Sequence, residues 1–198
     1  MSLDAAAVAG GLADPVMGSQ GIFRALMTAM AEPGTIAEFG ALVAAPAALA
    51  PAAAAILAAL ADPDTPVWLE EADEAAHRWL RFQTGAPIAQ TPAGATFAVL
   101  SPGSSPARWR DFAVGTQEYP DRSATLILPV AWLEGGPPLD LAGPGIETRR
   151  TIAPSGLPVG FHEAMTANRR GFPLGFDLVL VAGSRAIALP RTTRIEEA

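Results

Sequence analysis

The segment GFPLGFDLVLVAGSRAIALPRTT, residues 171–193, contains two apolar runs from which the predicted fold follows. Its apolar run at 178–182 suits a strand covered on both faces, and Gly183 and Ser184 then supply residues typical of a turn. The second apolar run stops at Pro190, which has no amide hydrogen for further strand pairing. We therefore expect two neighbouring strands joined as an antiparallel hairpin.

Asp177 stands directly in front of the first of these runs. A carboxylate buried without a partner is strongly destabilising, so we expect it to be hydrogen-bonded or to reach the surface. In a structural role it would accept backbone amides of the preceding turn. The alternative is a polar contact at a dimer or subunit cleft.

Other segments extend the sheet. ATFAVL at 95–100 and ATLILPVAWL at 124–133 are apolar nearly throughout, which predicts buried strands. GTIAEF at 34–39 alternates like a short strand, and EGGPPLDL at 134–141 predicts a second hairpin with a glycine-containing turn. The sheet is therefore expected to be mixed.

Helical spacing of apolar residues and helix-boundary residues mark four helices, the first of them capped by Ser19. They are expected at 19–30, 51–61, 70–84 and 157–170. The predicted fold class is α/β, with three layers and a mixed central sheet. We expect a flexible N-terminal arm at 1–15 and a single domain at 16–198.

Composition excludes several classes of function. The net charge of −7 and the pI of about 4.8 disfavour nucleic acid as a partner. No apolar stretch is long enough to span a membrane, and the N-terminus lacks the basic start of a signal peptide, so we expect a cytoplasmic protein. His77 and His162 are the only histidines, which leaves no multi-histidine metal site.

Two absent residue types exclude particular chemistries on this chain. The sequence contains no cysteine, so it offers no thiolate nucleophile and no cysteine ligand for an iron-sulfur cluster. All 13 basic residues are arginine. Without lysine the chain cannot form a Schiff base with pyridoxal phosphate (PLP). We expect no cofactor.

Candidate site residues come from three short segments. Asp62, Asp64 and Thr65 in DPDTP could bind a ribose hydroxyl, or a phosphate through magnesium, although turn formation is their commoner role. Glu32, at a helix end, could act as a general base or be a solvated helix stop. The pair Arg191 and Thr192 offers donors suited to an anion or to a partner's carboxylate.

Six blocks of the sequence, taken in order, resemble the PhnH family of the bacterial carbon-phosphorus lyase system. They are FRALMTAMAEPGTI, LADPDTPVWL, LRFQTGAP, GTQEYPDRSATLIL, GPGIE and FPLGFDLVLVAGSRAIALPRTT. Each block alone is weakly specific, whereas six in the same order are specific. The resemblance covers nearly the whole chain.

The resemblance implies a homodimer with a reduced version of the PLP-dependent transferase fold that lacks the PLP site. It also implies assembly with the PhnG, PhnI and PhnJ subunits. In that pathway a phosphonate displaces adenine from ATP, which gives ribose 1-phosphonate 5-triphosphate, and the PhnJ subunit later cleaves this product. The nucleosidase chemistry is placed on PhnI, and no agreed catalytic residues carry over to this chain.

Two functions therefore stay open. The chain is either a scaffold or accessory subunit of the core complex, or a ligand-binding or catalytic subunit with its own ATP or phosphonate pocket. The small number of histidines and the lack of cysteine and lysine favour the accessory role.

Overall fold

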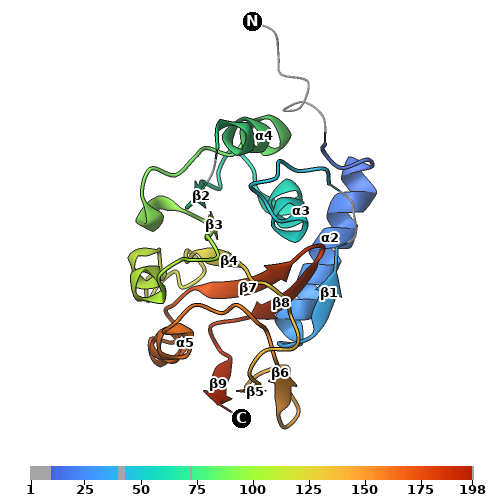
Figure 1. Ribbon diagram of the computed structural model, residues 1–198. Helices are drawn as coiled ribbons and strands as arrows, with labels where there is room; N and C mark the ends of the chain where they lie inside the picture. Colours follow the sequence, from blue (N-terminus) through green and yellow to red (C-terminus); the bar gives the residue numbers. More distant parts are fainter. Residues whose placement is uncertain (1–9, 40–42, 72, 198) are drawn as a thin grey trace, which may run out of the picture.

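The computed structural model describes residues 10–39, 43–71 and 73–197, which fold in three layers (Figure 1). A six-stranded sheet of order β1-β8-β7-β4-β3-β2 forms the middle layer. Its strands are β1 (Ile36–Glu38), β2 (Val67–Leu69), β3 (Phe97–Val99), β4 (Thr125–Pro129), β7 (Asp177–Ala182) and β8 (Arg185–Leu189). Strands β2, β3, β4 and β7 are parallel, while β1 and β8 are antiparallel to their neighbours. The predicted α/β class with a mixed central sheet is confirmed.

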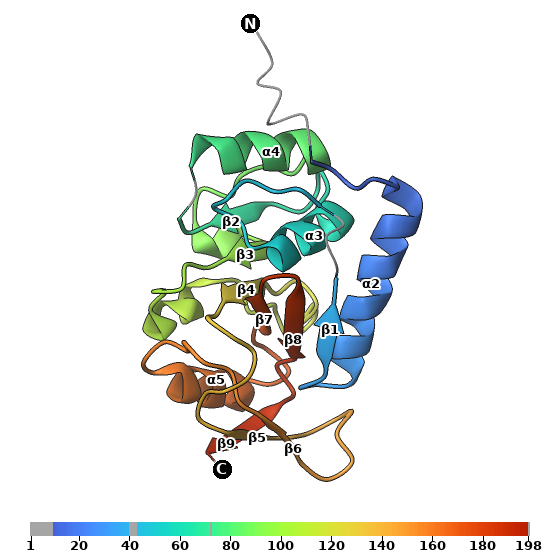
Figure 2. The same cartoon turned by 45° about the vertical axis from the view of Figure 1, so that its right-hand side comes forward.

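The helices cover both faces of this sheet. One face carries α2 (Pro15–Ala31), α3 (Pro51–Leu60) and α4 (Glu74–Thr84). The other face carries the short 3₁₀ helix η2 (Pro106–Asp111) and α5 (Phe161–Arg170). A further 3₁₀ turn, η1 (Pro92–Gly94), precedes β3. Figure 2 shows α2 running along the outer side of the molecule beside β1.

After Thr125 and Asp177, their first residues, the central strands β4 and β7 are apolar because they face two hydrophobic cores. Leu178 and Leu180 of β7 pack into the core that contains η2 and α5. Val179 and Val181 point the other way, into the core built by α2, α3 and α4. Successive side chains of a strand point to opposite faces. In a strand covered on both sides, every interior position therefore faces a hydrophobic core.

The expected hairpin is confirmed. Strands β7 and β8 pair antiparallel, with Ala182 opposite Arg185 and Leu178 opposite Leu189. Gly183 has a φ of 58° and begins the two-residue turn. A positive φ at the first position is typical of a tight hairpin turn, and glycine adopts it without steric cost.

The first helix begins earlier than predicted. It starts at Pro15, and Asp14 caps it by accepting hydrogen bonds from the amides of Val16 and Met17 at 3.1 and 3.0 Å. Ser19 therefore lies inside the helix, where its hydroxyl donates to the carbonyl of Pro15. An aspartate followed by proline is a stronger start signal than an isolated serine.

The second predicted hairpin, at 134–141, is wrong. The chain leaves the main sheet after β4, and residues 139–142 instead form β5 (Leu139–Ala142) of a separate antiparallel sheet. In that sheet β5 lies between β6 (Arg150–Ile152) and β9 (Arg194–Glu197). Pro137 and Pro138 have no amide hydrogen, so the stretch before β5 cannot pair with β4.

Part of one prediction lies outside the described residues. The N-terminal arm was expected at 1–15, and residues 1–9 are not described. The helix at 51–61 is confirmed as α3.

In the part of the chain that the structure describes, no helix has the length and apolar character needed to cross a membrane.

Candidate functional site

Asp177 and Arg191 form a largely buried ion pair that is joined by three hydrogen bonds. The Asp177 carboxylate accepts the Arg191 amide at 2.8 Å and the guanidinium Nε at 3.1 Å through Oδ1, and it accepts Nη2 through Oδ2. Arg191 also donates to the carbonyl of Pro120 and to the hydroxyl of Ser123. The two side chains are only 16% and 13% exposed. This contact ties β7, the segment after β8 and the loop before β4 together.

The partner of Asp177 differs from the one expected. Its carboxylate accepts the amide of Arg191, beyond the hairpin, and not an amide of the preceding turn. The register of the hairpin explains this, because Leu178 lies opposite Leu189 and Asp177 therefore reaches the chain just after Pro190. The two-residue turn predicted from the sequence was the signal that could have identified the pair.

A cavity of about 410 Å³ lies against this pair. Asp177, Arg191 and Thr192 contribute to its wall, so the structure brings three candidate residues together. The remaining lining residues are Met30, Pro120, Asp121, Phe172, Pro173 and Pro190. The cavity is mainly apolar, and its buried charges are already bonded to each other.

Glu32 contributes its backbone to a turn. Its amide donates to the carbonyl of Thr28 and closes α2, and its own carbonyl accepts Arg150 Nη1 at 3.0 Å. Arg150 also binds the carbonyl of Pro33 and the hydroxyl of Thr35. The side chain of Glu32 is exposed.

Asp62, Asp64 and Thr65 form a self-contained turn between α3 and β2. Asp62 Oδ1 accepts the Asp64 amide at 2.9 Å and the Thr65 hydroxyl at 3.0 Å. This is the local hydrogen bonding that favours Asp in turns. Strands β3 and β4 separate β2 from β7, so this turn lies about 14 Å or more from the strand of Asp177, at roughly 4.8 Å per strand.

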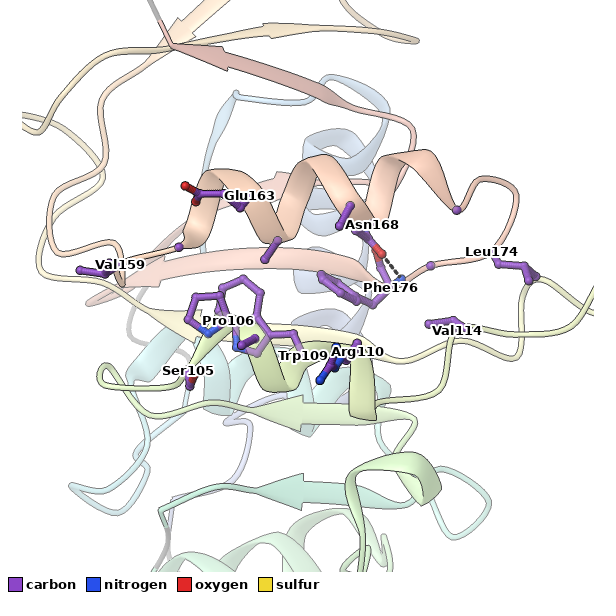
Figure 3. A pocket seen from close by; sticks show the side chains of 16 residues that line it. Ser105, Pro106, Trp109, Arg110, Val114, Val159, Glu163, Asn168, Leu174 and Phe176 are labelled. Atoms are coloured by element: carbon purple, nitrogen blue, oxygen red, sulfur yellow. Dashed lines mark hydrogen bonds between the residues drawn. The ribbon is translucent and has the colours of Figure 1, made fainter.

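A larger cavity of about 640 Å³ lies between η2 and α5 (Figure 3). Its floor is the buried Trp109, whose ring meets Phe161 and Phe176 edge-on, with both pairs of centroids 6.1 Å apart. On α5, Asn168 exchanges two hydrogen bonds with the backbone of Phe176, at 2.9 and 3.0 Å. Glu163 is the one carboxylate in the lining. The lining is otherwise mostly apolar and suits an apolar group.

A third cavity, also about 640 Å³, has basic walls and lies between α5 and β9. We call it the basic cavity. Its lining residues are His162, Thr166, Arg169, Arg170, Arg194, Ile195 and Glu196. Sequence reasoning missed it because β9 was not predicted to lie beside α5, although the helical spacing of 162, 166, 169 and 170 was a usable signal.

The second sheet fixes the surroundings of Glu196. Arg149 bridges Glu196 at 3.2 Å and Asp140 at 3.3 Å, which lie opposite each other on β9 and β5. The hydrogen bond from Thr151 lowers the pKa of Asp140 most, partial burial opposes this, and Arg149 adds to the lowering. One guanidinium thus offsets part of the negative charge of both carboxylates.

No group of three or more His, Asp or Glu side chains in residues 10–39, 43–71 and 73–197 is arranged to hold a metal ion.

Sequence comparison finds a family model and one relative that match nearly the whole chain, and a second relative that matches part of it. A sequence model of the family described as "Bacterial phosphonate metabolism protein (PhnH)" matches residues 10–196. Alpha-D-ribose 1-methylphosphonate 5-triphosphate synthase subunit PhnH of Rhizobium meliloti (strain 1021) is 46% identical over 189 residues, which is 94% of each chain. Putative C-P lyase subunit protein HtxG of Stutzerimonas stutzeri is 39% identical over 82 residues, 41% of this chain and 42% of that protein.

Proposed function

The chain belongs to the PhnH family of bacterial phosphonate metabolism proteins, and on this basis we propose that it is a subunit of the carbon-phosphorus lyase complex. In organophosphonate catabolism it is required for forming ribose 1-phosphonate 5-triphosphate from ATP and a phosphonate. One observation carries this proposal: 46% identity over 94% of both chains to a relative named as a subunit of that synthase.

Within the complex we assign the chain a scaffold or accessory role. The hydrogen bonds of Asp177 and Arg191 support this role. Arg191 uses Nε, Nη1 and Nη2 to bind protein acceptors, and both oxygens of Asp177 accept from Arg191. Side chains whose donors and acceptors already bind other protein groups hold segments of the chain together. They have few donors or acceptors available for a substrate.

The exposed side of α2 supports a further part of the proposal, that two copies of the chain pair as a homodimer. We define the α2 face as Val16, Met17, Phe23 and Met27, each 49–65% exposed. The opposite side of the helix is buried through Ile22, Leu26 and Ala29. An apolar stripe exposed in this way is typical of a protein interface. Strand β1, an edge of the sheet, lies beside it (Figure 2).

The remaining expectations from the resemblance belong to the same proposal. The chain assembles with the PhnG, PhnI and PhnJ subunits and works in the cytoplasm, where ATP is available. Its fold is a reduced form of the PLP-dependent transferase fold without the PLP site. The absence of lysine from the sequence supports the last point, since no residue can form the Schiff base.

The competing proposal is a ligand-binding or catalytic subunit with its own nucleotide or phosphonate pocket. The cavity at which Asp177, Arg191 and Thr192 meet favours it. Exchanging Thr192 for valine in an assembled complex separates the two proposals. The accessory role predicts unchanged turnover, whereas loss of turnover with intact assembly supports a pocket at this place.

Growth tests the subunit role. A Rhizobium meliloti strain that lacks its own PhnH relative is supplied with this chain, with methylphosphonate as the sole phosphorus source. We expect growth to be restored, because the two proteins are similar along their whole length. Normal growth on phosphate is the control. If the chain is produced at normal levels and methylphosphonate still supports no growth, the proposal is contradicted.

A further inference from the structure

We propose that the basic cavity between α5 and β9 binds a small anion that carries a phosphate or phosphonate group. Its walls combine His162, Thr166, Arg169 and Arg170 of α5 with Arg194 of β9. The two elements lie side by side (Figures 1 and 2). The site is separate from the candidate cluster at Asp177, and it does not depend on the subunit role proposed above.

The charge of the cavity is the first argument. The whole chain carries a net charge of −7, yet three of its 13 basic residues gather around this one cavity. Among the side chains that the structure describes, no ion pair joins Arg169, Arg170 or Arg194 to a carboxylate. Glu196 also lines the cavity, but Arg149 binds it at 3.2 Å from the neighbouring sheet. The cavity therefore keeps a net positive charge, because three arginines outnumber the one glutamate in its lining.

The second argument is a donor without an acceptor. The Nε atom of Arg169 is buried and has no hydrogen-bond partner in the described part of the protein. The guanidinium carbon of Arg169 lies 5.1 Å from the centre of the Phe172 ring, within the range of a cation–π contact. Buried polar atoms in proteins almost always have a partner. Because this atom has almost no accessible surface, an anion in the cavity would accept from it only after a small movement of the Arg169 side chain.

The spacing of the polar residues along α5 is the third argument. His162, Thr166 and Arg169 follow one another at intervals of four and three positions, so they line one side of the helix. The His162 Nε2 atom lies 3.0 Å from the carbonyl of Ile195. A carbonyl only accepts, so Nε2 must carry the hydrogen, and this bond fastens β9 to the helix. Thr166, which lies between His162 and Arg169 along the helix, adds a hydroxyl to the lining.

Stabilisation of the helix end accounts for part of this arrangement only. Arg169 and Arg170 lie in the last turn of α5, where positive charge complements the helix dipole. That effect requires neither Arg194, which comes from another element, nor a cavity of about 640 Å³ between them. Both features are expected of a site that surrounds a ligand.

The chemistry of the walls selects the class of ligand. Guanidinium groups pair through two parallel hydrogen bonds with the oxygens of phosphates and phosphonates. A concave site with several arginines suits a compact group with more than one negative charge, such as a phosphonate or a short polyphosphate. We therefore assign the site to a small molecule and treat an acidic segment of a partner protein as the outcome that would refute the assignment.

Calorimetric titration of the full-length chain tests the assignment. Methylphosphonate, pyrophosphate and ATP are titrated separately, which distinguishes a free phosphonate from a polyphosphate or a nucleotide. We expect saturable binding of at least one of them. Exchanging Arg170 or Arg194 for glutamine should weaken that binding about tenfold or more, since a hydrogen bond to a charged group is lost.

Arg108→Gln is the matched control. It removes the same charge from a surface arginine of η2 that is 71% exposed, and it should leave the affinity unchanged. Melting temperatures of all three variants establish that they are folded. Absence of saturable binding to the wild-type chain overturns the proposal, and so does an equal loss of affinity in the Arg108 variant. Impaired complex assembly in the Arg170 and Arg194 variants, without small-anion binding by the wild type, would assign the cavity to an acidic partner instead.

Discussion

At the scale of single residues, Asp177 and Arg191 connect three segments that are distant in the sequence. Exchanging Asp177 for alanine leaves a largely buried guanidinium without its carboxylate. We expect the free energy of unfolding to fall by about 3 kcal/mol, the usual cost of breaking a buried ion pair from one side. Urea unfolding followed by circular dichroism measures this loss.

Asp121→Ala is the control for that change. Asp121 lines the same cavity but is exposed, so its loss should alter the stability little. If Asp177→Ala destabilises the protein no more than Asp121→Ala does, the pair does not hold the segments together. Comparable loss of stability in Arg191→Ala would strengthen the assignment.

Asp140 provides a prediction about pH. Its pKa is lowered chiefly by the hydroxyl of Thr151, which donates at 2.7 Å. Because the folded pKa lies below the ordinary value of about 3.9, its stabilising contribution is present above that value and is lost as the pH falls through the folded pKa. Thr151→Val should raise the pKa of Asp140 toward the ordinary value, as followed by NMR of the carboxyl carbon. An unchanged titration would show that Thr151 has no such effect.

Sequence reasoning identified several of these residues without their partners. Asp177 and Arg191 were both candidates, but their pairing depends on the register of the hairpin. The basic cavity could not be foreseen, because Arg194 meets α5 only after the chain has formed β9 on the second sheet. Contacts between residues far apart in the sequence are decided by tertiary packing, which local patterns do not encode.

At the scale of elements, the sequence predicted those helices and strands that local patterns of apolar and turn residues determine. The helix at 51–61 and the strand pair after Phe176 follow from apolar runs and turn residues, and both are confirmed. The prediction of a hairpin at 134–141 was wrong. Glycine and proline indicate a turn, but they do not determine the sheet to which the next strand belongs. The short helix η2 has too few turns to show a helical period.

Helix α3 packs closely because its buried positions are mostly alanine. Ala54 is completely buried on this helix, which contacts α2, α4 and β7. Exchanging it for leucine should lower the free energy of unfolding by about 1–3 kcal/mol, since extra methyl groups force the packed elements apart. Ala58→Leu, at a half-buried position of the same helix, should have a smaller effect. Equal effects of the two variants in urea unfolding would contradict close packing around α3.

At the scale of the whole molecule, the proposed dimer depends on the α2 face. Phe23 is 49% exposed, and exchanging it for glutamate places a charge in the proposed interface. We expect this variant to be monomeric in light scattering coupled to size-exclusion chromatography. Phe82→Glu, at an equally exposed position of α4, should remain dimeric. If Phe23→Glu still dimerises, the interface lies on another surface.

In the function proposed above, the chain is a required, non-catalytic subunit of the synthase. The most direct measurement is the formation of ribose 1-methylphosphonate 5-triphosphate from ATP and methylphosphonate by the purified complex, assembled with and without this chain. We predict turnover only when the chain is present, and none from the chain alone. Equal turnover without the chain would contradict its requirement, and turnover by the isolated chain would contradict its accessory role.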